Sequence, residues 1–336
     1  MDNRWLARRL GQSGRVAIDW GELRRLADLQ LGLLTRKQCL AAGMTADAVD
    51  WRVGSRRWAR VHEGVYQTTP GRADWQATAT AALLFALSDT HAGDAALCGR
   101  SAAYLWGVES RQPAVVELLV PERRRVRAPE GARVRRSFRW DGVVDDLAFP
   151  WRTRPPATVL DVASSGTPID ALSLVARAVQ KELVTPRELL QEITARGGHK
   201  HSKILRAALM DVADGAQSGA EVLYIRDVER AHGLPTATRQ APSQVGALRL
   251  HDNGYEQFGL IVEVDGRLGH EQWSDRVRDG RRDRQLLTRD RVTTRVFFAD
   301  VAVRPCQTAG ELAAILRSKG WAGRPRRCRR RGCTLA

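Results

Sequence analysis

Two carboxylates on an apolar strand are the residues whose types and spacing point most directly to chemistry. Residues 261–266 read Ile-Val-Glu-Val-Asp-Gly, a β-branched run that contains Glu263 and Asp265. Such a run predicts a buried strand, where a carboxylate is costly unless it is paired or bound to a metal. Asp252 lies 11 positions before Glu263 across a predicted hairpin, so antiparallel pairing would bring the two acids together. Because like charges repel at close range, a divalent cation between them explains the pattern.

The predicted metal site uses Asp252, Glu263 and Asp265 as ligands for Mg²⁺ or Mn²⁺. A bound cation lowers the pKa of its water, so hydroxide forms and can attack a phosphodiester. His270 comes after the strand and is a candidate for proton transfer, because its ordinary pKa suits that role. The alternative for His270 is a turn residue hydrogen-bonded to Asp279.

Three further residues could complete such a site. Glu221 comes three positions after Ser218, the spacing of a helix capping box, and could also direct its acid at the metal. Arg278 and Arg282 lie on a predicted helix, and a guanidinium matches two phosphate oxygens well. The alternative for both arginines is ordinary ion pairing with the aspartates of the same helix.

This order of motifs over residues 218–303 resembles the PD-(D/E)XK nuclease superfamily, and within it the very-short-patch-repair endonuclease-like branch. The motifs are an acid, a Glu-x-Asp-Gly strand end, a Gly-His-Glu turn and an Arg-Asp helix: Asp252, Glu263 to Gly266, Gly269 to Glu271 and Arg278 to Asp283. The resemblance implies Asp252 and Glu263 on Mg²⁺, with Glu221 as an accessory acid. The superfamily usually has a lysine where this chain has Asp265, so a nuclease fold that no longer cuts stays open.

Near the N-terminus, residues 19–69 predict three short helices and then a basic hairpin. Thr35 and Thr45 are placed to cap the second and third helices, and Gly43 is placed to end the second. Residues 58–66 alternate like a hairpin with a glycine turn. This order predicts a winged helix-turn-helix, whose third helix enters the major groove of DNA.

The segment from Leu34 to Tyr66, which ends in His-x-Gly-Val-Tyr, resembles the N-terminal winged-helix domain of AbiEi-type antitoxins. The resemblance implies DNA binding by four arginines around the third helix and the hairpin: Arg52, Arg56, Arg57 and Arg60. A winged helix used only for protein contacts is the alternative.

The overall charge supports a polyanionic partner. The formal net charge is +16 and the sequence pI is about 10.7, which favours nucleic acid over a merely solvated basic surface. We expect DNA, and RNA is not excluded because a basic surface does not distinguish the sugars. No apolar run approaches the roughly 18 residues of a spanning helix and no signal-peptide core is visible, so we expect a cytoplasmic protein without membrane contact. The oligomeric state, a homodimer included, is open.

The five cysteines predict neither disulfides nor a metal site. Their odd number and scatter argue against a disulfide framework. Cys328 and Cys333 flank an arginine run without a second pair, which argues against zinc there.

Together these patterns predict an α/β multidomain protein. Its parts are a winged helix-turn-helix DNA-binding domain, an α+β middle domain, a restriction-endonuclease-like α/β domain and a disordered arginine-rich tail: residues 1–72, 73–196, 197–320 and 321–336. In the middle domain, the basic residues 123–139 predict a hairpin that is either a solvated face or an extension of the DNA surface. Residues 197–202 predict a linker, with His199 and His201 at the surface.

The predicted function is a DNA-binding, Mg²⁺-dependent endonuclease in defence, repair or a toxin-antitoxin setting. The alternative is a non-catalytic DNA-binding regulator or antitoxin-like protein with an inactive nuclease fold. Asp265 in the lysine position and the antitoxin-like winged helix favour the alternative.

Overall fold

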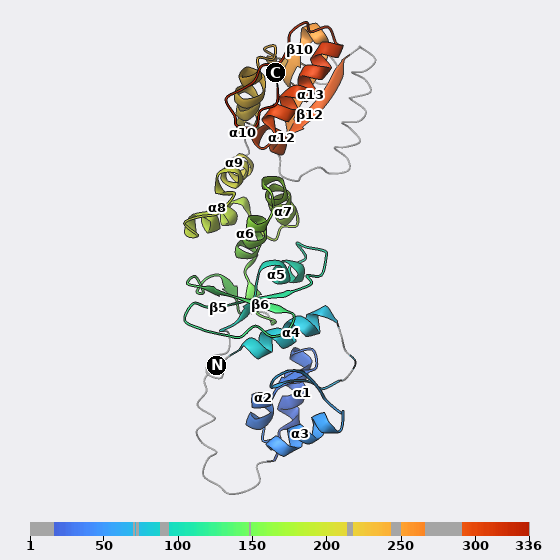
Figure 1. Cartoon of the computed structure of the whole chain (residues 1–336), viewed down its shortest axis with the longest axis vertical. Helices are drawn as coiled ribbons and strands as arrows, with labels where there is room; N and C mark the ends of the chain where they lie inside the picture. The colour runs from blue at the N-terminus through green and yellow to red at the C-terminus, as the bar shows by residue number, and fades with distance from the viewer. Residues whose placement is uncertain are drawn as a thin grey trace. The chain divides into compact units, whose positions relative to one another are not determined.

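The protein is a mixed α/β multidomain chain, as expected. The computed structural model describes residues 17–69, 71, 74–87, 94–147, 149–213, 218–242, 250–265 and 291–335. It contains two compact units, one ending at Arg154 and one beginning at Pro155, and Figure 1 labels several of their elements. No helix in the described ranges has both the length and the apolar character needed to cross a bilayer.

The first unit begins with three helices and a three-stranded antiparallel sheet of order β1-β3-β2. In chain order the elements are α1 (Trp20–Leu29), β1 (Leu33–Thr35), α2 (Arg36–Ala41), α3 (Ala46–Gly54), β2 (Ala59–His62) and β3 (Val65–Gln67). Thr35 accepts a hydrogen bond from the Gln38 N–H and Thr45 accepts one from the Ala48 N–H, so both predicted helix caps are confirmed. These caps fix where α2 and α3 begin.

The remainder of the first unit is a five-stranded sheet of order β6-β5-β4-β8-β7 with two helices. Its elements are α4 (Trp75–Ala86), β4 (Ala96–Leu97), α5 (Gly99–Leu105), β5 (Val116–Pro121), β6 (Ala132–Ser137), β7 (Val144–Asp145) and β8 (Arg152–Thr153). The core of this sheet is apolar and includes Leu83, Leu97, Leu118 and Val120.

The hairpin predicted within residues 123–139 is wrong, because β6 pairs in parallel with β5, from the Val116–Ala132 pair onward. A parallel neighbour requires the chain to return to the start of the strand before it pairs. Arg124 anchors that return segment: its Nη1 donates to the Asp94 carboxylate at 2.8 Å and to the Ala86 carbonyl at 2.8 Å. This ion pair and hydrogen bond therefore anchor the connection between β5 and β6 to the residues around Ala86 and Asp94.

The second unit opens with four helices: α6 (Pro155–Ser165), α7 (Pro168–Gln180), α8 (Pro186–Ala195) and α9 (Ser202–Ala213). Capping boxes with a proline in the first turn begin α7 and α8, where Thr167 pairs with Asp170 and Thr185 with Glu188. Asp170 is thus the acid of a helix cap.

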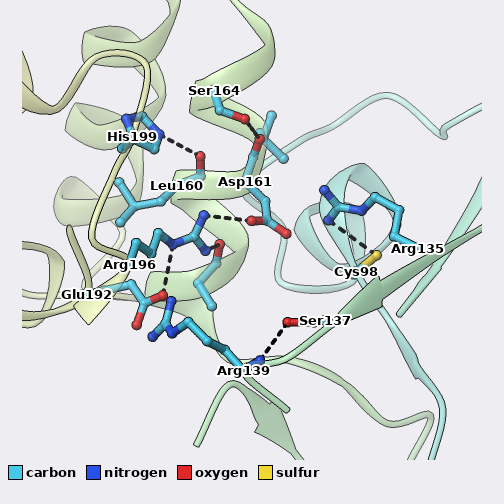
Figure 2. A network of polar contacts seen from close by, with 12 residues as sticks. Cys98, Arg135, Ser137, Arg139, Leu160, Asp161, Ser164, Glu192, Arg196 and His199 are labelled. Carbon is cyan, nitrogen blue, oxygen red and sulfur yellow. Dashed lines mark hydrogen bonds and ion pairs between the residues drawn. The ribbon is translucent and has the colours of Figure 1, made fainter. Parts of the chain in front are cut away.

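Arg196 and His199 fasten the end of α8 onto α6 (Figure 2). Arg196 donates to the carboxylates of Asp161 at 2.7 Å and Glu192 at 2.9 Å. The His199 Nε2–H donates to the Leu160 carbonyl at 2.9 Å, and the His201 Nε2–H donates to the Gly166 carbonyl at 3.0 Å. The prediction of surface histidines in a linker is therefore wrong, because both rings donate to backbone carbonyls and His201 is only 7% exposed.

The last part of the second unit is a four-stranded sheet of order β12-β11-β10-β9. β10 is antiparallel to β9 and β11, whereas β11 and β12 are parallel. The elements are α10 (Ser218–Leu223), the π-helix η2 (Tyr224–Arg230), β9 (Thr238–Pro242), β10 (Leu250–Tyr255), the 3₁₀ turn η3 (Glu256–Phe258), β11 (Leu260–Asp265), β12 (Val292–Phe297), α12 (Phe298–Ala302) and α13 (Pro305–Ser318).

A buried carboxylate, Glu229, joins η2 to this sheet. Its side chain is 1% exposed and accepts from the Ala237 N–H at 3.1 Å and the Tyr255 hydroxyl at 3.1 Å. The Arg239 guanidinium also donates to Glu229, and it donates to the side-chain oxygen of Asn253. Burial raises the pKa of Tyr255, so its hydroxyl stays protonated and remains a donor. The buried charge is therefore both paired and hydrogen-bonded.

Replacing Glu229 with glutamine is expected to lower the free energy of unfolding of the second unit by on the order of 3 kcal/mol, because the Arg239 guanidinium loses its partner. Urea unfolding of the full chain, monitored by circular dichroism, measures the change. Glu256→Gln is the control, because Glu256 is exposed on η3, the turn between β10 and β11. Equal stability of the two variants would contradict the assigned role.

The His199 ring gives the second unit a pH dependence. Burial lowers the pKa of His199, whose neutral ring accepts the His201 backbone N–H at Nδ1, 3.1 Å away. Because the folded pKa lies below the unfolded value of about 6.5, this stabilisation is complete above that pH and is lost as pH falls toward the folded pKa. We expect Tm to fall less steeply between pH 7 and pH 5.5 in His199→Gln than in the parent. If the Tm of both proteins fell equally over this pH range, the assigned role of His199 would be wrong.

Candidate nucleic-acid interface

Arg52, the first of the predicted DNA-binding arginines, packs among indole rings. Its guanidinium carbon lies 4.8 Å from the Trp20 ring centroid, 5.5 Å from that of Trp58 and 5.9 Å from that of Trp51. Its Nη1 donates to the Ala48 carbonyl at 2.9 Å. Such stacking holds an arginine by cation–π attraction and apolar contact, so Arg52 positions α3 and its three tryptophan neighbours.

The other three arginines of that prediction are exposed or partly exposed along the chain from α3 into β2. Arg56 lies in the connecting turn with a φ of 59°, and Arg60 lies on β2. The Arg57 guanidinium carbon is 4.9 Å from the ring centroid of Trp51, which is itself 55% exposed. Guanidinium groups and an indole on one exposed surface are the side chains that phosphate and base contacts use.

The exposed face of α3 carries acids rather than further arginines. Asp47 and Asp50 are both exposed, and Asp50 accepts from the two terminal nitrogens of Arg36 at 2.6 and 3.1 Å. This hydrogen-bonded pair lowers the pKa of Asp50 and raises that of Arg36. Carboxylates repel phosphates, so any phosphate contact at this surface has to come from the turn and from β2.

A hollow of about 700 Å³ borders the same surface within the first unit. Its basic lining comes from Arg36, Lys37 and Arg60, and its apolar lining includes Phe85 and Trp151. Arg60 therefore lies between an exposed cationic surface and a partly apolar recess.

A second basic surface lies on β6 and the segment before it. Arginines along it include Arg123, Arg125, Arg127, Arg133 and Arg136. Some of them line a shallow groove of about 310 Å³ with Val126 and Val134. Arg135 is held against the fold, since its Nη2 donates to Cys98 Sγ at 3.5 Å, and the backbone N–H of Arg139 donates to Ser137 Oγ at 3.0 Å (Figure 2). β6 is also an edge strand, where charge prevents pairing with other chains.

The predicted metal ligands lie on neighbouring strands. β10 and β11 pair Asn253 with Val262, so Asp252 and Glu263 occupy the next opposed positions of that register. Glu263 lies 3.5 Å from the Arg295 Nε of β12, a neighbour that already offsets its charge. The Mg²⁺ hypothesis stays a prediction, because the side chain of Asp252 lies outside the described residues.

The other residues of that hypothesis are placed only in part. Asp265 ends β11 and is partly buried, and Glu221 lies in the first turn of α10. His270, Arg278 and Arg282 lie outside the described residues.

A second group of potential metal ligands lies near the C-terminus. The ligand atoms of His232, Cys306, Cys328 and Cys333 all lie within 4.8 Å of one another. The cysteine spacing in the sequence does not reveal this group, because Cys306 lies 22 residues before Cys328 and the fourth potential ligand is a histidine. The single sequence signal is the Cys-x₄-Cys spacing in the tail.

The tail itself differs from the predicted disorder. The Arg326 N–H donates to the His232 carbonyl at 2.8 Å, and the Arg326 Nη2 donates to the Arg230 carbonyl at 2.9 Å. Cys333 is buried. The arginine-rich segment has too few apolar residues to form a core of its own. Its hydrogen bonds to the chain around His232 and the burial of Cys333 hold it in place instead.

The middle of the chain is similar to a known antitoxin domain. Residues 95–210 match the family described as the AbiEi antitoxin C-terminal domain. One solved structure, the RV2827C protein from Mycobacterium tuberculosis, is 15% identical with a TM-score of 0.38, and the alignment covers 76% of this chain and 88% of that one. No curated protein matches.

The family match corrects the predicted resemblance in two ways. It lies at residues 95–210 and concerns the C-terminal domain of the antitoxin, whereas the N-terminal winged-helix domain was expected at residues 34–66. The comparisons also give no support to a very-short-patch-repair endonuclease. Residues 95–210 are similar to the C-terminal domain of AbiEi antitoxins.

Proposed function

We propose that the protein is a DNA-binding regulator of the antitoxin type, acting in a toxin-antitoxin setting. The observation that carries this proposal is the match of residues 95–210 to the AbiEi antitoxin C-terminal domain. The net charge of +16 and the two basic surfaces support nucleic acid as the partner.

The DNA-binding element in this proposal is a winged helix formed by α1 to β3. The order of three helices and a β2–β3 hairpin supports it, since in such domains the third helix enters the major groove while the hairpin tracks the backbone. Arg56, Arg57 and Arg60 then contact phosphates. The exposed Asp47 and Trp51 of α3 face base edges, where a carboxylate accepts from the amino group of cytosine.

Replacing Arg57 and Arg60 together with alanine is expected to weaken DNA binding and to flatten its salt dependence. The slope of log K against log salt should fall in magnitude by about 2, since each phosphate contact contributes about 0.9. Fluorescence anisotropy of the full chain with the duplex immediately upstream of its own coding sequence measures this slope. Arg187→Ala, an arginine in the first turn of α8, is the matched control. An unchanged slope in the double variant would remove these residues from the interface.

Mg²⁺-dependent cleavage of DNA is the second candidate function. The register of β10 with β11, which pairs Asn253 with Val262, supports it, because the next position in each strand is an acid, Asp252 or Glu263, and a pair of carboxylates suits a divalent cation. The ion pair of Glu263 with Arg295 and the presence of Asp265 in the usual lysine position favour the regulator.

The regulator proposal predicts that supercoiled plasmid stays intact with saturating protein and either Mg²⁺ or Mn²⁺. Gel electrophoresis detects nicking, and calorimetry with Mg²⁺ tests binding of the cation directly. The control is Glu263→Gln, purified in parallel to reveal contaminating nuclease. If the parent nicks the plasmid and Glu263→Gln does not, the protein is an endonuclease and the regulator proposal is wrong.

A further inference from the structure

Three segments that are far apart in the sequence bring three thiols and one imidazole to one place. His232 lies two residues after η2, Cys306 lies in the first turn of α13, and Cys328 and Cys333 belong to the C-terminal tail. Their ligand atoms lie within 4.8 Å of one another. α13 packs against η2, and this contact brings Cys306 close to His232.

The sulfur spacing matches a shared metal ion better than a disulfide. Cys306 Sγ and Cys328 Sγ are 3.6 Å apart, and both cysteines are free. Tetrahedral zinc with Zn–S bonds of about 2.3 Å places two sulfurs about 3.8 Å apart. A disulfide requires about 2.05 Å.

The histidine is held in the orientation of a metal ligand. The His232 Nδ1–H donates to the Arg326 carbonyl at 3.0 Å, which leaves a lone pair on Nε2. His232 is fully buried, and its Nε2 has no hydrogen-bond partner in the described structure. A buried acceptor without a partner is costly, and a carbonyl that fixes the other ring nitrogen is the usual support of a metal-bound imidazole.

The backbone and the charges around the cysteines also favour a bound metal. The Arg330 N–H points to Cys328 Sγ at 3.4 Å. One divalent cation with three thiolates and a neutral imidazole carries one net negative charge. The tail that supplies two of these ligands also contains cationic neighbours, among them Arg327, Arg329 and Arg331, which favour an anionic complex.

We propose that His232, Cys306, Cys328 and Cys333 bind one Zn²⁺ ion tetrahedrally and so fasten the arginine-rich tail to α13 and the end of η2. Thiolates select zinc over Mg²⁺, and the four side chains leave no open position, so the ion is structural. Each thiol gives up its proton to solvent when its sulfur binds the metal. This site is independent of the proposed regulatory function.

The first test is the metal content and coordination of the full chain purified under reducing conditions. Mass spectrometry should find one zinc per chain. X-ray absorption should show three sulfurs at about 2.3 Å and one nitrogen at about 2.0 Å. Because it uses the unaltered chain, it does not depend on whether a variant folds. Absence of zinc after reconstitution, or coordination by oxygen and nitrogen alone, would overturn the proposal.

The second test assigns the ligands. Cys328→Ser and His232→Ala should each lose more than half of the bound zinc, whereas Cys39→Ala, which changes a buried cysteine of the first unit, should retain it. Chelation of the parent should accelerate tryptic cleavage at the arginines of the tail, within residues 326–331, more than tenfold, because the tail loses its anchor. Full zinc retention in both ligand variants, or an unchanged cleavage rate after chelation, would count against the site.

Discussion

The buried Glu229 carboxylate is the interaction on which the C-terminal part of the structure depends. It gathers Ala237, Arg239 and Tyr255 around one charge, and so joins η2 to β9 and β10. A carboxylate that is 1% exposed is tolerated only with such partners. Anchoring Glu229 also fixes the end of the same helical segment, where His232 lies three residues later and meets the cysteines of α13 and the tail.

Some arginines of each basic segment are held by other side chains, and others remain exposed to solvent. At the N-terminal surface, Arg52 is held among tryptophans, while Arg56 and Arg57 remain exposed. Between β5 and β6, Arg124 forms an ion pair with Asp94, while other arginines of the same run face solvent. A count of basic residues therefore overstates how many of them are available to a polyanion.

Local patterns predicted local structure well. The caps at Thr35 and Thr45 begin helices because the side-chain oxygen accepts a hydrogen bond from the backbone N–H three residues later. The apolar run before Asp265 forms a strand of the sheet. The parallel pairing of β5 with β6 was missed, because the connection between them is anchored by a contact 30 residues away in the sequence, the Arg124–Asp94 ion pair, which no local pattern reveals.

The sequence by itself determined the basic character of the chain, the positions of the capped helices and the presence of carboxylates on the β11 strand. These properties depend on composition or on residues a few positions apart. Only the tertiary structure decided which arginines stay exposed, that Glu263 meets Arg295, and that His232 meets three cysteines. Such contacts join residues separated by tens of positions, and no local spacing encodes which of them the packed core brings together.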